Sequence, residues 1–147
     1  MSGDEGNDYV FGGAGSDTVN GNLGADRLTG GLGKDFLTGG SEADTFVFTK
    51  LNESSFVRAN ADHITDFQHG VDHIDVALID ANVNKAGNQA FKYIGDHNFS
   101  KAGQISSHWD AVHNETVVSF NTDNDRAAEM KIVLDGHITL NGGDFIL

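Results

Sequence analysis

The chain has 147 residues, and its 22 Asp and Glu residues outnumber its 9 Lys and Arg residues, giving a formal net charge of −13 at pH 7. This excess of negative charge disfavours nucleic acid and anionic membranes as partners and favours cations. The chain has no cysteine, which excludes disulfides and thiolate metal sites. No apolar run is long enough to span a membrane, and the length predicts one domain, which we expect to be monomeric.

Five nine-residue repeats in one unbroken register occupy residues 3–47. They read GDEGNDYVF, GGAGSDTVN, GNLGADRLT, GGLGKDFLT and GGSEADTFV. Glycine fills the first place in all five repeats and the fourth place in four of them. The sixth place is always aspartate, at Asp8, Asp17, Asp26, Asp35 and Asp44. The eighth place is always apolar, at Val10, Val19, Leu28, Leu37 and Phe46. A solvated linker would have no reason for this apolar residue, so the pattern predicts a folded repeat.

The repeated glycines and aspartates suit a calcium site. Ca²⁺ takes six to eight oxygen ligands, commonly carboxylates and backbone carbonyls. Glycine allows positive φ, which can turn successive carbonyls toward one point. The expected ligands are therefore the five sixth-place aspartates and the backbone carbonyls of Gly6, Gly13, Gly15, Gly24, Gly31 and Gly33. We expect several ions.

The last three residues of each repeat are expected to form a short strand whose central apolar side chain points inward. Two repeats then complete one turn, so the loops of every second repeat stack and place the ions between Asp8/Asp26, Asp17/Asp35 and Asp26/Asp44. Asp4 and Asn22 replace a second-place glycine, and Glu42 replaces a fourth-place glycine. We therefore expect the Asp26/Asp44 site to be the weakest.

The balance of free energies predicts that the repeats need the ion in order to fold. Ordering nine residues costs about 1–2 kcal/mol each for the backbone alone. Burying the single apolar side chain of a repeat returns only about 1.5–3 kcal/mol.

The residues after the repeats, 48–140, are expected to form a β-rich cap. Strands are predicted around Thr45–Thr49, His73–Ile79, Gln89–Ile94, Thr116–Asn121 and Lys131–Leu134, with turns at Gly70, Gly87, Gly95 and Gly136. Repeat arrays need such caps. The expected cap core consists of Phe46, Phe48, Ile64, Phe67, Ile74, Val76, Val118, Phe120, Ile132 and Leu134. Trp109 and Tyr93 are also expected to belong to the core rather than to a ligand platform.

Further acidic residues follow the repeats. Asp62, Asp66 and Asp72 could complete a terminal Ca²⁺ site or cap a turn, and for each residue we favour the turn. Asn121, Asp123, Asp125 and Glu129 have the spacing of a Ca²⁺ loop. However, Arg126 stands where such a loop needs glycine and no glutamate closes it, so we expect this loop to be degenerate.

The repeats resemble the RTX, or haemolysin-type, calcium-binding nonapeptide. From Asp44 onward, ADTFVF, DHITDFQHGVDHIDV (62–76), NTDNDRAAEMKIVL (121–134) and DFIL (144–147) resemble the serralysin-type C-terminal domain, which is related to repeat modules of mannuronan C5-epimerases. This resemblance implies an all-β fold, a parallel β-roll of nonapeptide repeats capped by C-terminal antiparallel strands.

The resemblance also implies export by a bacterial type I (ABC) secretion apparatus, with folding outside the cell where Ca²⁺ is available. Residues 141–147 would carry the secretion signal, whose acidic-then-hydrophobic ending is Asp144, Phe145, Ile146 and Leu147. An N-terminal catalytic domain is expected to be missing from this chain, because the repeats begin directly after Met1-Ser2.

No HExxH zinc motif or serine nucleophile motif is present, so we expect the chain to be non-catalytic. Two functions remain open. The first is a folding and secretion module that exports and stabilises an attached extracellular enzyme, such as a metalloprotease. The second is an accessory module that binds a polysaccharide such as alginate. Arg27, Lys34 and Lys50 are the main basic residues near the repeats that could meet such a polyanion.

Overall fold

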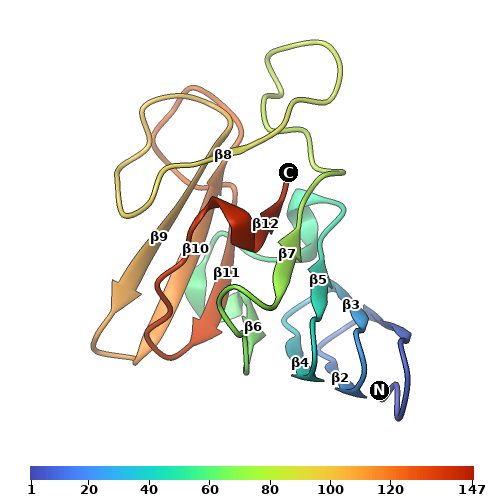
Figure 1. Ribbon diagram of the computed structural model, residues 1–147. Helices are drawn as coiled ribbons and strands as arrows, with labels where there is room; N and C mark the ends of the chain where they lie inside the picture. The colour runs from blue at the N-terminus through green and yellow to red at the C-terminus, as the bar shows by residue number, and fades with distance from the viewer.

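The computed structural model describes all residues 1–147 and consists almost entirely of β-strands (Figure 1). The strands are β1 (Tyr9–Ala14), β2 (Thr18–Leu23), β3 (Arg27–Leu32), β4 (Phe36–Ser41), β5 (Thr45–Val47), β6 (Asp62–Ile64), β7 (His73–Asp75), β8 (Lys92–Tyr93), β9 (Gln104–Asp110), β10 (Glu115–Asn121), β11 (Met130–Asp135) and β12 (Phe145–Ile146). Three short 3-10 helices, η1 (Leu51–Glu53), η2 (Arg58–Asn60) and η3 (Gly142–Asp144), complete the structure.

The repeats form a parallel β-roll, as expected. Each of the strands β1 to β4 joins the last three residues of one repeat to the first three of the next. Strands one full turn apart pair in parallel, so that Val10 lies opposite Leu28 and Val19 lies opposite Leu37, each two repeats further along the chain. The eighth-place side chains point into the roll and are buried. The period-two alternation of a strand is thus enough to build the inner core.

The roll continues beyond the repeats with a sequence that no longer repeats. One sheet has the order β1-β3-β5-β7-β12 and the other β2-β4-β6-β11-β10-β9-β8. Leu37 pairs with Ile64, and Phe46 pairs with Ile74, so the chain between these partners is longer than two repeats. The extra residues before β6 leave the roll as the segment that carries η1 and η2. β6 and β7 therefore add a further layer of strands to the roll.

Three antiparallel strands extend the second sheet. β9, β10 and β11 pair antiparallel, and β11 then pairs in parallel with β6. Figure 1 shows these long strands at the side of the roll, continuous with it through β6. The expected strands around Thr116–Asn121 and Lys131–Leu134 are confirmed as β10 and β11. β9 was not predicted, because its sequence QISSHWD lacks the continuous β-branched content of its neighbours.

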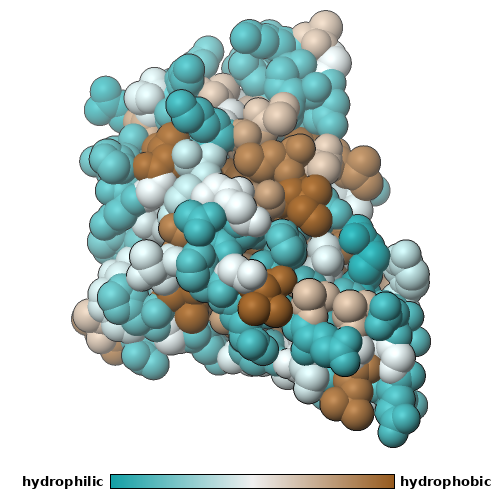
Figure 2. Space-filling model, in the orientation of Figure 1, coloured by the Kyte–Doolittle hydropathy of each residue, from teal (hydrophilic) through white to brown (hydrophobic).

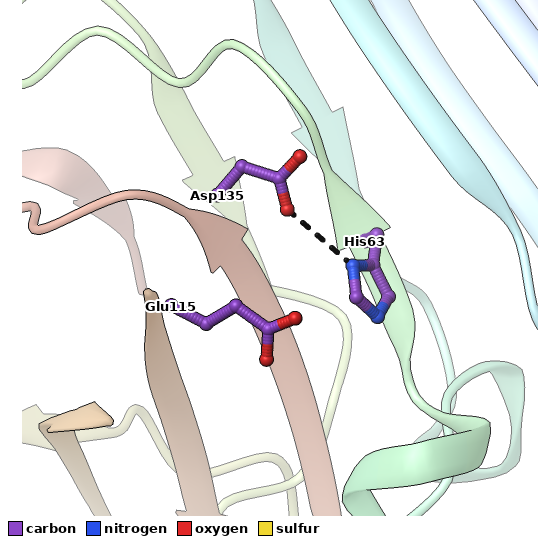
Figure 3. Close-up of side chains that lie close together, drawn as sticks. All are labelled: His63, Glu115 and Asp135. Carbon is purple, nitrogen blue, oxygen red and sulfur yellow. Dashed lines mark ion pairs between the residues drawn. The ribbon is translucent and has the colours of Figure 1, made fainter. Parts of the chain in front are cut away.

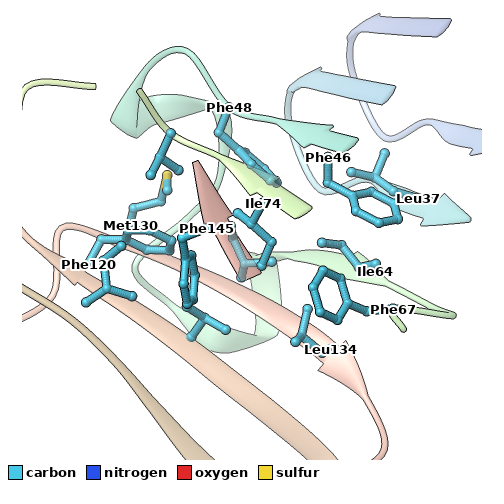
Figure 4. Close-up of a cluster of buried hydrophobic side chains, with 14 of the residues drawn as sticks. Leu37, Phe46, Phe48, Ile64, Phe67, Ile74, Phe120, Met130, Leu134 and Phe145 are labelled. Atoms are coloured by element: carbon cyan, nitrogen blue, oxygen red, sulfur yellow. The ribbon is translucent and has the colours of Figure 1, made fainter. Parts of the chain in front are cut away.

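A single apolar cluster joins the roll to the cap. Figure 4 shows Leu37, Phe46 and Ile64 from the roll on one side, with Phe120 and Met130 from the cap on the other. All ten residues expected to form the cap core belong to this cluster. Phe91, Ile105 and Phe145 also belong to it and were not foreseen. The cap thus covers the end of the roll with the same side chains that fill the roll's interior.

One expectation about aromatic residues needs correction. Trp109 is only half-buried, and its ring stacks on His137 with a centroid distance of 4.5 Å. Tyr93 packs against the core, as expected, and its hydroxyl lies 2.6 Å from Oγ of the buried Ser107. The turns at Gly70, Gly87, Gly95 and Gly136 all have positive φ, as the turn assignment requires.

The visible surface is mostly hydrophilic, and its apolar residues form separate small patches (Figure 2). One of these patches lies around the C-terminus, where Ile146 and Leu147 are 39% and 38% exposed. No helix in this structure is long and apolar enough to cross a bilayer.

Candidate metal centre

The sixth-place aspartates form two hydrogen-bonded ladders along the roll. In each step, one carboxylate oxygen, Oδ1, accepts a hydrogen bond from the backbone N–H of the aspartate one coil earlier. The first ladder runs through Asp8, Asp26, Asp44 and Asp72, with N to Oδ1 distances of 2.8, 2.9 and 3.0 Å. The second ladder runs through Asp17, Asp35 and Asp62, with distances of 2.8 and 2.9 Å. The stacking of every second repeat, predicted from the sequence, is confirmed by these contacts.

The other carboxylate oxygen of six of these seven residues has no hydrogen-bond partner although it is buried. This is so for Oδ2 of Asp8, Asp17, Asp26, Asp35, Asp44 and Asp62. Buried polar groups in native proteins are almost always paired, and an unpaired carboxylate in a buried position is costly. Six such atoms, repeated at every coil, form a regular array of candidate cation ligands.

First-place glycines make room for these carboxylates. A Cβ atom at Gly21 would lie 2.2 Å from Oδ2 of Asp26, and one at Gly30 would lie 2.4 Å from Oδ2 of Asp35. No side chain larger than hydrogen can therefore occupy the first place while the aspartate points inward. The carboxylate at the sixth place of the same repeat thus accounts for the glycine at Gly21 and Gly30, whereas at Gly12 a Cβ would meet the carbonyl oxygen of Gly30 at 2.2 Å.

Glycine carbonyls face the loop of the next coil. Cβ atoms at Gly24, Gly31 and Gly33 would lie 2.4, 2.0 and 2.0 Å from the carbonyl oxygens of Gly6, Gly13 and Gly15, respectively. All six of these glycines have φ between 102° and 135°. The glycine carbonyls expected as ligands thus lie in the stacked loops, together with the aspartate ladders.

The three departures from the glycine pattern keep the glycine backbone conformation. Asp4, Asn22 and Glu42 have φ of 74°, 80° and 77°. The ladder bond from Asp26 to Asp44 is formed, and Oδ2 of Asp44 is unpaired like the others. The backbone geometry therefore offers no counterpart to the weakness expected for the Asp26/Asp44 site.

The electrostatics of the ladders favour a cation. Burial raises the pKa of Asp62 to about 8, and the charges of Asp35 and Glu53 add to this increase. Burial likewise raises the pKa of Asp44 to about 6, with the neighbouring charges of Asp72 and Asp26 contributing. The pKa values of Asp35 and Asp72 are also raised, chiefly by burial. Each raised pKa means that the carboxyl group loses its proton less readily than usual unless a positive charge lies nearby.

The three acidic residues beyond the repeats have different environments. Asp62 matches the repeat aspartates, because it joins a ladder and has an unpaired Oδ2. Asp72 also joins a ladder, but its Oδ2 accepts the backbone N–H of Gln68. Asp66 accepts the backbone N–H groups of Gly39 and Gly40 with its two oxygens and so caps that loop. The sequence favoured a turn role for all three, and the geometry singles out Asp62 as the ligand candidate.

A second group of titratable side chains lies between the roll and the cap. Figure 3 shows His63, Glu115 and Asp135 converging from β6, β10 and β11, with His63 Nδ1 3.5 Å from Asp135. Arg58 pairs with Glu115 and lies 3.6 Å from Asp110. The guanidinium already supplies the positive charge that these carboxylates need. We therefore assign this group to an ion-pair network that joins the roll to the cap.

A β-roll with two stacks of glycine loops and repeated unpaired carboxylates defines a calcium-binding repeat module. The chain belongs to the peptidase M10 serralysin C-terminal family, whose sequence model matches residues 5–147. The resemblance expected from the repeats and from the C-terminal segments is thereby confirmed.

Similar solved structures include two solution structures from the mannuronan C5-epimerase of Azotobacter vinelandii. The AlgE6R2 subunit is 23% identical with a TM-score of 0.62, over 100% of this chain and 91% of that one. The AlgE6R3 subunit is 22% identical with a TM-score of 0.60, over 98% of this chain and 80% of that one. At these identities the likeness establishes the β-roll fold. No curated protein sequence matches the chain.

Proposed function

We propose that this chain is a secreted, non-catalytic, monomeric module that folds when it binds Ca²⁺ and that exports and stabilises an attached extracellular enzyme. The observation that carries the proposal is the set of six buried Oδ2 atoms without partners on the two aspartate ladders. Together with the glycine carbonyls of the stacked coils, these atoms would supply the all-oxygen ligand set that Ca²⁺ prefers.

The ladders explain why folding and ion binding would be one event. Adjacent coils lie about 4.8 Å apart. Two unit charges at this spacing repel by about 3 kcal/mol at an effective dielectric constant of 20. Ionised aspartates in successive coils therefore oppose the roll, and a divalent cation between them reverses the sign of the interaction. In a compartment with little Ca²⁺ the chain would stay unfolded, and outside the cell it would fold.

Folding on the ion can be tested directly. Far-ultraviolet circular dichroism of the full chain should show an unfolded spectrum in chelator and a β-rich spectrum in millimolar Ca²⁺. Mg²⁺ at the same concentration is the matched control, because it dehydrates reluctantly and demands a tighter octahedral geometry. A β-rich spectrum already present in chelator would refute the proposal.

Half of the proposed C-terminal signal is buried in the folded chain, whereas Ile146 and Leu147 stay partly exposed. Asp144 is buried and accepts hydrogen bonds from His69 Nδ1 and from the backbone N–H groups of Gly70 and Asn141. Phe145 belongs to the core. β12 is therefore an ordinary edge strand in the folded chain, and an exporter would have to read residues 144–147 in the unfolded chain. This order of events agrees with folding outside the cell.

The structure also changes how export should be tested. Deleting the last four residues would remove a core phenylalanine, so loss of the signal and loss of the fold would coincide. Ile146→Ser/Leu147→Ser changes only half-exposed side chains and should reduce export while Ca²⁺-induced folding persists. Leu78→Ser/Val83→Ser is the matched control, since these two apolar residues are also exposed. Undiminished export of the first variant would contradict the signal assignment.

A second candidate function is binding of an anionic polysaccharide. Arg27 is paired with Asp75, and Lys34 donates to the carbonyl of Ala59, so these basic residues are already engaged. Two pockets on the cap share Ser119 and Lys131 in their linings, and Arg126 lines one of them. Arg58 lines the other but is already paired with Glu115. This part of the surface offers basic side chains in an otherwise acidic protein.

Titration of the Ca²⁺-loaded chain with alginate oligomers, followed by amide chemical shifts, would separate the two functions. Saturable shifts around Ser119 and Lys131, abolished by Lys131→Gln, would favour the polysaccharide-binding module. Lys92→Gln, at an exposed lysine on β8, is the control substitution. Absence of any shift would leave the folding and export function alone.

A further inference from the structure

A second cluster of oxygen ligands lies outside the roll, in the loop between β10 and β11. The carboxylates of Asp123, Asp125 and Glu129 converge, each offering an oxygen within 4.8 Å of the others. No lysine, arginine or histidine forms an ion pair with any of the three. Three negative charges therefore lie close together with no positively charged side chain paired to them, although each carboxylate accepts one backbone N–H, from Thr122, Asp125 or Ala127.

A buried amide lies within the same loop. Asn121 is fully buried, and its Nδ2 donates to the backbone carbonyls of Asp125 and Ala127 at 3.0 and 2.7 Å. Its Oδ1 has no hydrogen-bond partner. The side chain that ties the loop together thus leaves a buried oxygen unpaired within the loop that carries the three carboxylates. An unpaired buried acceptor in a native protein calls for an explanation.

The spacing of these oxygen donors is that of a calcium loop. In an EF-hand loop the ligands come from positions 1, 3, 5, 7 and 9, the seventh through its backbone carbonyl, and a bidentate glutamate follows at position 12. With Asn121 at position 1, the other donors are Asp123, Asp125, the carbonyl of Ala127, and Glu129. The twelfth position is Ile132, which is buried in the core.

The loop is closed in a way that the sequence did not reveal. Oε2 of Glu129 accepts the backbone N–H of Thr122 at 2.6 Å, so the chain turns back at position 9. Arg126, at the position where an EF-hand has glycine, does not have positive φ. The sequence was expected to give a degenerate Ca²⁺ loop because it was compared with the twelve-residue EF-hand loop. The structure instead forms a shorter loop, which brings its carboxylates together without a glycine.

We propose that the Asn121–Glu129 loop binds one Ca²⁺ ion at a site separate from the roll. The donors are all hard oxygen atoms, and they combine carboxylates with amide and backbone carbonyls, the mixture that Ca²⁺ accepts in irregular geometry. Without a bidentate ligand at position 12, the site belongs with the extracellular modules whose dissociation constants are about 10⁻⁴–10⁻³ M.

The test counts ions in the full Ca²⁺-loaded chain by native mass spectrometry. Asp123→Asn and Glu129→Gln should each reduce the count by one ion per chain, while the Ca²⁺-induced circular dichroism change is retained. Asp96→Asn is the matched control, because Asp96 is an exposed carboxylate that contacts only His108. An unchanged count in both loop variants would overturn the proposal.

A measurement on the unmodified chain covers the case in which a loop variant fails to fold. Substoichiometric Mn²⁺ added to the Ca²⁺-loaded protein should broaden the amide signals of residues 122–129 and spare that of Asp96. Loop signals that remain sharp while roll signals broaden would overturn the loop site alone. Failure of the chain to fold in Ca²⁺ would instead contradict the proposed function of the roll, so the two failures are distinguishable.

Discussion

Replacing Asp62 with asparagine should stabilise the chain without Ca²⁺, and Ca²⁺ should remove most or all of this gain. In the absence of a cation, the pKa of Asp62 is raised from 3.8 to about 8. A carboxyl whose pKa is raised in the folded state stabilises the fold fully below pH 3.8, and this stabilisation is lost as the pH rises toward 8. At pH 7 the loss covers about three pH units, or about 4 kcal/mol at about 1.36 kcal/mol per unit.

Asp62→Asn removes this cost and keeps the oxygen that accepts the N–H of Asp35. The new amide N–H would lack an acceptor where Oδ2 now lies unpaired, which costs about 1–3 kcal/mol. In chelator at pH 7 the variant should therefore be more stable than the parent by about 1–3 kcal/mol. In about 10 mM Ca²⁺ it should lose one ion, worth about 1.4–2.7 kcal/mol for a dissociation constant of about 10⁻⁴–10⁻³ M.

Two measurements check this difference between the two conditions. Because the chelated chain is expected to be unfolded, its stability is read from the concentration of trimethylamine N-oxide that restores the β-rich spectrum. Stability in Ca²⁺ is read from urea unfolding. Asp66→Asn is the matched control: both oxygens of Asp66 are already bonded to N–H groups, so it should destabilise the chain by about 1–3 kcal/mol in both conditions without losing an ion. Equal destabilisation of Asp62→Asn in both conditions would refute the reasoning.

Three further predictions rest on the same contacts. Gly31→Ala should destabilise the Ca²⁺-loaded chain by more than about 3 kcal/mol in urea unfolding. The φ of Gly31 is positive, and a Cβ there would meet a backbone carbonyl at 2.0 Å. Gly142→Ala is the control and should change the stability little, because Gly142 faces open space. Lowering the pH from 8 to 5 should protonate Asp62 first and then Asp44. In chelator, less osmolyte should then restore the fold, and in Ca²⁺ a higher ion concentration should be needed to fold half of the chains. A Ca²⁺ midpoint that does not change with pH would contradict this prediction. Phe46→Ala should cost about 3–5 kcal/mol in the Ca²⁺-loaded state, because the ring is fully buried where roll and cap meet, and a loss below about 1 kcal/mol would show that this core is not shared.

The nine-residue period determined the roll by itself. An aspartate at the sixth place and an apolar residue at the eighth specify an inward carboxylate and a buried strand residue. The first half of each strand, the pairing of every second repeat and the Asp8/Asp26 and Asp17/Asp35 contacts could therefore be predicted. The continuation of β1 to β4 through the first three residues of the next repeat, glycines included, was not predicted. The information is local and is repeated five times. Even the core residues of the cap, such as Phe120 and Leu134, could be recognised from their alternation in strands.

Only the tertiary structure decided what happens where the period ends. Ladder continuation by Asp62 rather than by Asp66 depends on the pairing of β4 with β6 across the η1 and η2 segment, which no local pattern specifies. The burial of Asp144 depends on its contacts with His69 and Gly70, which lie in the middle of the chain. Convergence of the carboxylates around Asn121 depends on how the chain turns back between two paired strands. A sequence repeat fixes contacts that recur at constant spacing, whereas these contacts occur once, at separations set by the packing of the whole chain.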